Sequence, residues 1–230
     1  MSWERVVIIG AGGHAREVAD ILRDQTREGA RPRLVGFVAD DPLNYPAEVS
    51  GIRFLGDWSW FDTADPVGLA VICAVGLPQL RKHLAGRAAA KGLAFASAVS
   101  PLAYVSPEAS LGDGVMVFPH AFVSDGSSLG DHAVVNVGSS VSHDAQIGRF
   151  GTLGPGVRVA GRVSVGEGAY LGVGSSVIDR VSVGAWTTVG GGACVTRDLP
   201  ANVTAVGVPA RVIKIKEEGW HEETDGISGG

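Results

Sequence analysis

The first part of the chain alternates between short apolar runs and stretches of helical periodicity. Apolar runs predict strands at residues 5–10, 33–41, 68–76 and 93–99, with a further short strand within 51–55. Helical periodicity predicts one helix from about residue 14 to 24 and another within 78–92. Strands and helices that alternate in this way form a small parallel α/β unit. Residues 40–58 are rich in Pro, Asn, Gly and Asp and are expected to be mostly loop.

From Val99 onward the hydrophobic period changes to six residues. Seventeen successive sixth positions, from Val99 to Val195, hold Val, Leu or Ile, and the positions four residues later hold mostly Ala, Ser, Gly, Thr or Val. This pattern predicts a triangular prism in which three short parallel strands make each 18-residue coil. We therefore expect an α/β domain over residues 1–98, the prism over 99–213 and a loosely ordered polar tail over 214–230.

Composition narrows the function. The 230 residues are 45% hydrophobic and 19% charged, which is enough apolar content to exclude a mainly disordered chain. The 34 glycines follow no Gly-X-Y period, so they indicate many tight corners and not a collagen helix. Nineteen Lys and Arg residues stand against 24 Asp and Glu with no densely basic stretch, so nucleic acid is not an expected partner.

Two cysteines and the amino terminus bear on location. Cys73 and Cys194 lack CxxC spacing, which predicts a reducing compartment and no metal site. The first residues lack the features of a secretory signal, and the sequence contains no run of about 18 apolar residues. We expect a soluble cytoplasmic protein without a membrane partner.

The first candidate site is GAGGHA at residues 10–15, between a strand and a helix. Glycines there let backbone N–H groups and the helix N-terminus approach a phosphate, and Asp40 and Asp41 end the next strand, where they could bond a hydroxyl of a ribose or base. A tight turn that binds nothing is the alternative. His14 is interpreted as a ligand contact, or alternatively as a polar cover of the helix start. Gly76 is expected at the carboxyl edge of the same sheet.

The second candidate lies in NVGSSVSHDAQIG at residues 136–148. His143 falls at a coil corner, with Asp144 beside it and Asp125 one 18-residue coil below. A carboxylate that accepts the imidazole N–H raises the basicity of the ring, which is the arrangement of a general base. An exposed structural histidine is the alternative, because corners of such prisms are polar. Other histidines without such partners are expected to be solvated: His83, His120 and His132.

Two columns of residues spaced by 18 are rich in glycine. Such columns could admit a slim extended ligand along the prism, or the glycines could serve only the corners of the repeat. One column holds Asn136, Gly154, Gly172 and Gly190, and the other holds Gly112, Gly130, Gly148, Gly166 and Gly184.

Nearly the whole chain, from about residue 5 to 213, resembles one family. The motifs that carry the similarity are GAGGHAREV, VADD, AVGLPQLRKHL, NVGSSVSHDAQIG and GGGACVTRDLPANVTAVGVPAR. They resemble the sugar-nucleotide N-acetyltransferases of bacillosamine and perosamine synthesis and the related sialic acid O-acetyltransferases. The resemblance implies a Rossmann-like α/β domain followed by a left-handed parallel β-helix, acetyl-CoA as co-substrate, and a homotrimer.

The resemblance also implies roles for single residues. His143 would be the general base, Asp144 the carboxylate that supports it, and Asn136 a polar group near the attacking amine. The residues implied to hold the nucleotide sugar are Gly12, Gly13, His14, Asp40, Asp41 and Gly76. Those implied to line the acetyl-CoA path are Thr152, Gly161, Val173 and Gly191, with the Gly161 N–H suited to bond the thioester oxygen. Thr152 stands where family members often carry a histidine.

The reaction expected from this resemblance is direct acetyl transfer to an amino group of a nucleotide-linked sugar. No covalent enzyme intermediate is expected, because no Ser or Cys is paired with a base. The active site is expected between subunits. Sialic acid-type O-acetylation is one alternative. A non-catalytic nucleotide-sugar-binding assembly module would leave His143 and Asp144 unused, and a nicotinamide-dependent sugar reductase would leave the hexads without a role.

Overall fold

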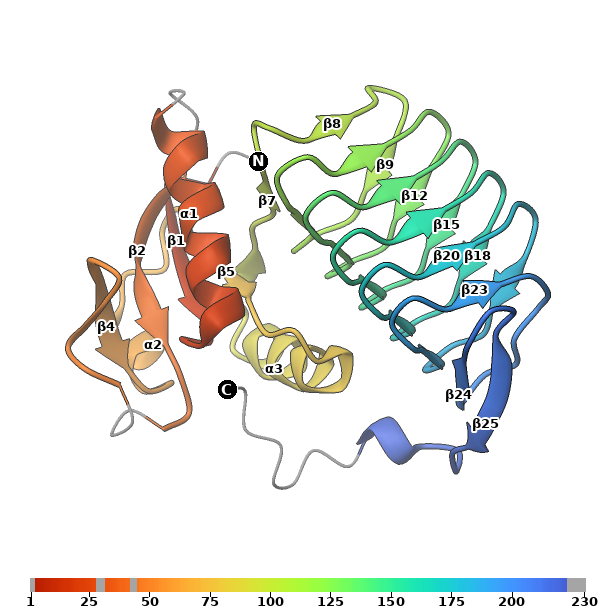
Figure 1. Ribbon diagram of the computed structural model, residues 1–230. Coiled ribbons are helices and arrows are strands. Elements are labelled where there is room, and N and C mark those ends of the chain that lie inside the picture. The colour runs from red at the N-terminus through yellow and green to blue at the C-terminus, as the bar shows by residue number, and fades with distance from the viewer. Residues whose placement is uncertain (1–2, 28–31, 42–44, 223–230) are drawn as a thin grey trace.

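The computed structural model describes residues 3–27, 32–41 and 45–222, which form an α/β domain beside a β-prism (Figure 1). The α/β domain is built on a six-stranded sheet of order β3-β4-β2-β1-β5-β6, parallel except for the edge strand β3. Its strands are β1 (Arg5–Ile9), β2 (Arg33–Val38), β3 (Glu48–Val49), β4 (Ile52–Gly56), β5 (Leu69–Cys73) and β6 (Ala94–Phe95). The strands predicted from the apolar runs are all present.

Helices cover both faces of this sheet. Helix α1 (Gly13–Arg27) and helix α3 (Pro78–Ala90) match the two predicted helices, and a short α2 (Trp60–Thr63) is added. In β1, Ile8 joins the core on the α1 side and Ile9 joins the core on the α3 side. A strand buried on both faces reads as a continuous apolar run, as the RVVII sequence does.

The prism has three faces of stacked parallel strands. The first face holds β7 (Ala98–Val99), β10 (Met116–Val117), β13 (Val134–Val135), β16 (Thr152–Leu153), β19 (Tyr170–Leu171), β22 (Thr188–Val189), β24 (Val203–Val206) and the antiparallel β25 (Arg211–Ile215). The second holds β8 (Tyr104–Val105), β11 (Phe122–Val123), β14 (Ser140–Val141), β17 (Arg158–Val159), β20 (Ser176–Val177) and β23 (Cys194–Val195). The third holds β9 (Ser110–Leu111), β12 (Ser128–Leu129), β15 (Gln146–Ile147), β18 (Ser164–Val165) and β21 (Ser182–Val183).

The register of these strands confirms the 18-residue coil. Val135 pairs with Leu153, and Leu153 pairs with Leu171, in steps of 18 residues. The aliphatic sixth positions and the small residues between them, such as Ala133 and Ala145, fill one core along the prism axis. The predicted pairing of one bulky and one small inward residue per hexad is therefore confirmed.

The glycine columns are closed by the neighbouring coils. A Cβ at Gly148 would lie 2.7 Å from the backbone nitrogen of Glu167, and a Cβ at Gly172 would lie 2.7 Å from that of Gly191. These glycines permit close stacking of successive corners. Backbone atoms of the next coil therefore occupy the space beside these glycines, as the interpretation of corner glycines expects, and only Asn136 and Gly154 of the first column line a cavity.

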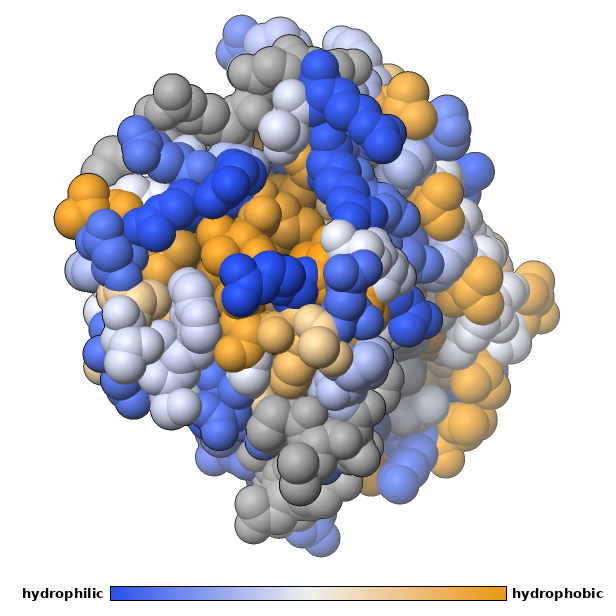
Figure 2. All heavy atoms as spheres, turned by 90° about the vertical axis from the view of Figure 1, so that its left-hand side faces the viewer, coloured by the Kyte–Doolittle hydropathy of each residue, from blue (hydrophilic) through white to orange (hydrophobic). Residues whose placement is uncertain are grey.

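The two parts of the molecule share a continuous core. Side chains of α1, including Val18 and Leu22, belong to the same buried cluster as Met116 and Val134 of the first prism face. The α/β domain is therefore packed directly against that face. Figure 2 shows the face of the α/β domain that points away from the prism. Charged and polar side chains surround an apolar patch at its centre.

The C-terminal segment departs from the expectation of a loosely ordered tail. Strand β25 extends to Ile215, and a 3-10 turn at Trp220–Glu222 brings the His221 ring onto Trp186, with ring centroids 3.8 Å apart. Lys216 donates to the Thr188 hydroxyl at 2.9 Å. Ring stacking and this hydrogen bond fix residues 214–222, whereas 223–230 lie outside the described part. No helix of the described part is long and apolar enough to cross a membrane.

Candidate active site

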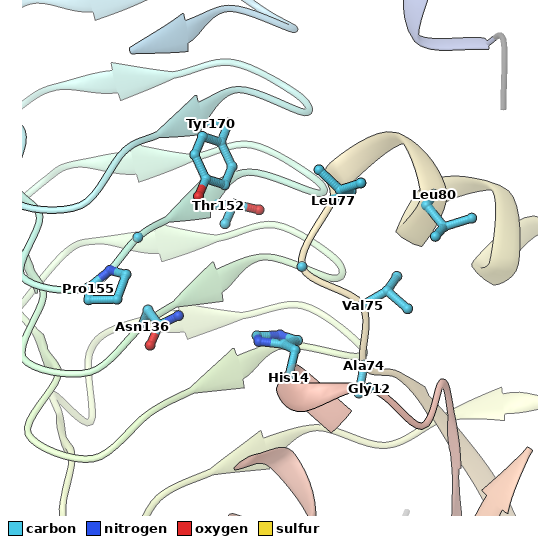
Figure 3. Close-up of a pocket in the computed structure, with 12 residues that line it drawn as sticks. Gly12, His14, Ala74, Val75, Leu77, Leu80, Asn136, Thr152, Pro155 and Tyr170 are labelled. Carbon is cyan, nitrogen blue, oxygen red and sulfur yellow. The ribbon is translucent and has the colours of Figure 1, made fainter. Parts of the chain in front are cut away.

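A cavity of about 310 Å³ lies between the carboxyl edge of the α/β sheet and the first prism face (Figure 3). Strand order reverses at β1 and β5, and the loops that follow these two strands form one wall. The other wall comes from the prism coils around β13, β16 and β19. The lining residues are Gly12, His14, Ala74, Val75, Gly76, Leu77, Leu80, Asn136, Thr152, Gly154, Pro155 and Tyr170.

Only part of the predicted nucleotide-sugar site meets at this cavity. Gly12, His14 and Gly76 line it, but among the described residues Gly13, Asp40 and Asp41 do not. The Asp40 carboxylate accepts a hydrogen bond from Arg87 of α3 at 2.6 Å, and this pair is exposed to solvent. Gly13 is the exposed first residue of α1, and a Cβ there would approach nothing closer than Arg16 Nη2 at 3.9 Å.

The backbone conformation of the loop after β1 requires glycine at position 10. The φ of Gly10 is +111°, and a Cβ there would lie 3.0 Å from the Ala74 carbonyl oxygen. A side chain at this position would therefore be strained and would press on the loop after β5. Gly10 sets the close approach of the two loops that form the cavity wall.

His14 presents a neutral imidazole to the cavity. Its ring stacks on Phe118 with centroids 5.2 Å apart and projects toward Asn136 (Figure 3). Burial, with a smaller contribution from the charge of Arg81, lowers the pKa of His14 to about 4. Its Nε2 atom is buried without a hydrogen-bond partner in the described residues. A buried polar atom without a partner is costly, so this nitrogen is suited to bond a ligand in the cavity.

Asn136 is oriented by its own loop. Its Oδ1 accepts the backbone N–H of Val137 at 2.7 Å, which leaves the amide nitrogen able to donate. Asn136 and His14 thus offer two neutral polar groups to the same cavity.

His132 is not the solvated histidine expected from the sequence. It is 4% exposed, its ring stacks on Phe150 with centroids 5.0 Å apart, and Phe95 meets it edge-on. Burial, with a smaller contribution from Arg81, lowers the pKa of His132 to about 4. Phe150 stands 18 residues after His132, so the stack is one coil step, and the prediction failed because it treated every corner as exposed.

Arg81 is the polar residue of this region that the sequence analysis missed. It is fully buried on α3 and donates to the Thr152 hydroxyl at 2.6 Å and to the Phe150 carbonyl at 2.7 Å. Thr152 is itself 4% exposed and lies on the cavity wall. Its hydroxyl thus accepts a hydrogen bond from Arg81 at the α/β–prism interface, beside the cavity.

His143 and Asp144 form a polar pair at a corner between the second and third prism faces. The Asp144 carboxylate accepts the His143 Nδ1–H at 2.9 Å, and the His143 side chain is 55% exposed. That hydrogen bond lowers the pKa of Asp144, with a smaller contribution from Arg162. Because a carboxylate only accepts, the neutral ring that makes this bond has its proton on Nδ1 and its lone pair on Nε2.

The structure selects Asp144 over Asp125 as the partner of His143. The Asp144 backbone N–H donates to the Asp125 carbonyl at 3.1 Å, so the lower coil supports the corner through its backbone. Above the ring, a Cβ at Gly161 would lie 2.6 Å from His143 Nε2. The absence of a side chain at Gly161 therefore makes room for the His143 ring. The Gly161 N–H donates to no backbone carbonyl among the described residues.

The two polar centres lie at opposite ends of β14. Asn136 precedes this strand, at the corner beside the cavity, and His143 follows it, at the next corner. Val173 and Gly191 stack on the Asn136 side, where Val173 is 60% exposed and lies against Gly191. A single chain therefore does not bring His143 to the cavity that holds His14 and Asn136.

This geometry fits acid–base chemistry on a bound ligand. An imidazole with a free Nε2 and a supporting carboxylate removes a proton from a nucleophile. The described residues contain no group of three His, Cys, Asp or Glu that could hold a metal ion. Burial raises the pKa of the Cys73 thiol to about 12, which removes it as a nucleophile.

Comparisons with known proteins agree with this arrangement. Residues 5–88 match the PglD N-terminal domain. PerB from Caulobacter crescentus, solved in complex with CoA and GDP-perosamine, is 41% identical over 90% of this chain and 96% of its own, with a TM-score of 0.82. The acetyltransferase domain of PglB from Neisseria gonorrhoeae, solved in complex with acetyl coenzyme A, is 30% identical over 92% of this chain and 100% of its own, with a TM-score of 0.84.

The chain belongs to the family of hexapeptide sugar N-acetyltransferases. This confirms the resemblance seen in the motifs and the fold class, a Rossmann-like α/β domain followed by a left-handed β-helix. WeeI from Acinetobacter baumannii is 25% identical over 91% of this chain and 100% of its own, with a TM-score of 0.83. The comparison with curated proteins gives no match.

Two buried histidines make stability depend on pH in this acetyltransferase. His14 and His132 each have a folded pKa of about 4 against an ordinary value of 6.5. Between pH 6.5 and pH 4 these histidines are protonated in the unfolded chain but not in the folded protein. The free energy of unfolding therefore keeps its full value above pH 6.5 and falls as the pH decreases toward 4. We expect a loss of roughly 2 kcal/mol per histidine between pH 7.5 and pH 5, measured by urea unfolding.

A pair of variants tests this origin. His132→Gln should reduce the pH-dependent loss by about half, because one of the two histidines is removed. His83→Gln, on the exposed side of α3, should leave the loss unchanged. An unaltered pH dependence in His132→Gln would assign the effect to other groups.

Proposed function

We propose that the protein transfers the acetyl group of acetyl-CoA to the amino group of a nucleotide-linked amino sugar. The observation that carries the proposal is the His143–Asp144 pair, whose 2.9 Å hydrogen bond leaves the imidazole Nε2 free to act as a base. The cavity beside His14 supplies the second requirement, a site for the sugar nucleotide. The relative solved with CoA and GDP-perosamine supports both ligand classes.

In this proposal His143 accepts the proton of the sugar amine while the amine attacks the thioester carbonyl. Asp144 holds the ring by the Nδ1 hydrogen bond and stabilises the imidazolium that forms. The Gly161 N–H adjoins the His143 ring and is suited to donate to the tetrahedral oxyanion. Collapse of the intermediate breaks the C–S bond and leaves an amide on the sugar, and the departing CoA sulfur takes the proton from the His143 imidazolium to leave as the thiol. No acyl-enzyme is formed.

We propose a GDP- or UDP-linked 4-amino sugar as the acceptor. The support comes from the structures named for perosamine N-acetyltransferase, which hold CoA and GDP-perosamine and are 40% identical to this chain. A nucleotide diphosphate is expected near Gly12 and the start of α1, where backbone N–H groups of a helix N-terminus favour phosphate.

The proposed active unit is a homotrimer in which His143 of one subunit serves the cavity of its neighbour. The separation of His143 and Asn136 along β14 supports this, because a site within one chain would lack either base or cavity. Tyr104 and Phe122, which stack with ring centroids 5.1 Å apart, expose large apolar surfaces on the second face and suit a subunit contact. The two free cysteines fit a cytoplasmic location.

An assay of purified protein tests the proposed activity. Acetyl-CoA is combined with GDP-, UDP- or TDP-linked 4-amino sugars, and thiol release and the product mass are measured. We expect an N-acetylated sugar from at least one of them. Transfer only to a hydroxyl, as in sialic acid-type O-acetylation, or NAD(P)H binding without acetyl transfer, would contradict the proposal.

The cavity itself can be tested by filling it. Gly76 lines the cavity and a Cβ there would meet nothing within 4 Å, so Gly76→Phe adds bulk without backbone strain. We expect KM for the nucleotide sugar to rise about tenfold or more while KM for acetyl-CoA stays within about twofold.

Gly86 offers a matched control for this variant. It lies on α3 outside the cavity, and a Cβ there also meets nothing within 4 Å. Gly86→Phe should leave both KM values near those of the parent. Equal increases for both substrates in Gly76→Phe would mean that the cavity is not specific to the sugar nucleotide.

A further inference from the structure

Arg81 uses all its hydrogen-bond donors without meeting a carboxylate. Its Nε donates to the His132 carbonyl at 3.0 Å, its Nη1 to the carbonyls of Val75 at 2.8 Å and Gly76 at 3.2 Å, and its Nη2 to Phe150 and Thr152. A guanidinium has five N–H donors, so every one has an acceptor. The side chain is fully buried, and burial lowers the pKa of Arg81, although a guanidinium stays protonated at neutral pH.

The five acceptors fall on two sides of the cavity. Val75 and Gly76 belong to the loop between β5 and α3, which forms the wall on the α/β side. His132, Phe150 and Thr152 belong to two successive coils of the prism, and Thr152 lies on the opposite wall. The planar guanidinium therefore joins both walls and fixes their separation.

A gain in folding stability does not by itself explain why a buried arginine occupies position 81. Removing a cation from water costs several kcal/mol, and a buried charged network is often no more stabilising than apolar side chains of similar volume. Geometry gives a better reason. A rigid fork with five fixed donors defines the relative position of four backbone carbonyls, two on the loop side and two on the prism side, more tightly than apolar packing does.

We propose that Arg81 is a positioning residue for the nucleotide-sugar cavity and that Thr152 serves it as a hydroxyl acceptor, not as a contact of the acetyl group. Arg81 holds the loop at residues 75–76 against the prism, and its charge helps to keep His14 neutral beside the ligand. The role rests on the proposed function, because it concerns the sugar-nucleotide part of that site.

Two variants test the role. Arg81→Lys keeps the charge but has a single ammonium that cannot reach acceptors on both sides, and Thr152→Val removes one acceptor without changing the side-chain shape. We expect KM for the nucleotide sugar to rise at least tenfold in Arg81→Lys and about three- to tenfold in Thr152→Val. For both variants kcat and KM for acetyl-CoA should stay within about twofold of the parent.

Lys82 supplies the matched control. It is the next residue on α3 and also spans the two parts of the molecule, through an ion pair with Glu167 at 3.0 Å, but it does not line the cavity. Lys82→Met should leave KM for the nucleotide sugar unchanged. An increase in Lys82→Met equal to that in Arg81→Lys would show a general loosening of the interface and would overturn the positioning role.

Binding of GDP and UDP, measured by calorimetry, separates the two proposals. If the parent protein binds neither nucleotide and acetylates no amino sugar, the proposed function fails. If the parent binds one of them and Arg81→Lys binds it equally well, the role of Arg81 fails. Should Arg81→Lys not fold, Thr152→Val decides, and a fall in its kcat with unchanged sugar KM would place Thr152 with the acetyl group.

Discussion

His143→Ala is expected to lower kcat by about 10²- to 10⁴-fold, which is the usual contribution of a positioned general base. The imidazole Nε2 is the free proton acceptor of the pair, and Asp144 already occupies Nδ1. The side chain is 55% exposed, so its removal leaves the prism core intact. The measurement is steady-state acetyl transfer to the preferred amino sugar nucleotide, with acetyl-CoA binding measured separately and expected to persist.

The carboxylates around His143 provide graded controls. Asp144→Asn should cost less than His143→Ala, because an amide oxygen still accepts the Nδ1–H while the negative charge is lost. Asp125→Asn should have little effect, since that residue supports the corner through its backbone carbonyl. Near-full turnover by His143→Ala on every substrate of the parent would disprove the catalytic assignment.

The fold could be predicted from the sequence because its periods are local. A continuous apolar run, as in β1, indicates a strand that is buried on both faces. A hexad with one bulky and one small residue indicates which side chains point into the prism. Neither pattern depends on distant parts of the chain. The spacing of 18 also puts Gly161 one coil above His143, whereas the choice between Asp144 and Asp125 as the partner of the ring needed the structure. These relations hold within one or two coils.

The features that the sequence analysis missed depend on how the two parts pack together. Arg81 occupies the apolar stripe of α3 that includes Leu84 and Ala88, and a charged residue at that spacing was the available signal. The acceptors of its guanidinium come from residues up to 71 positions away, which no local pattern encodes. His132 was missed for the same reason, because α3 and β6 cover its corner and Phe95 reaches its ring.

The glycine-rich loop shows a different limit. Its spacing indicated a phosphate site, and the cavity does form beside Gly12 and His14. The sequence could not distinguish Gly10, whose φ of +111° requires glycine, from Gly13, which is exposed at the start of α1. Asp40 was expected at the ligand because it lies at the end of the strand predicted over residues 33–41, but β2 ends at Val38 and the Asp40 carboxylate is bonded by Arg87 of α3.

Mixed trimers should recover activity from two impaired variants if His143 and the cavity belong to different subunits. His143→Ala retains the cavity and Gly76→Phe retains the base. In trimers assembled at random from equal amounts, about one quarter of the sites combine an intact cavity, with probability one half, and an intact neighbouring His143, with probability one half. We expect about one quarter of the parent kcat/KM for the nucleotide sugar, measured below KM on co-refolded subunits that light scattering shows to be trimers.

The control for this experiment places both defects in one chain. Trimers that mix His143→Ala with the double variant His143→Ala/Gly76→Phe contain no intact base and should stay inactive. A site built within one chain has both groups on the same subunit, so mixing the two single variants would give no activity above the average of the two unmixed variants. Because Asn136 and His143 lie at opposite ends of β14, the proposed shared site predicts recovery, and its absence would refute a shared active site.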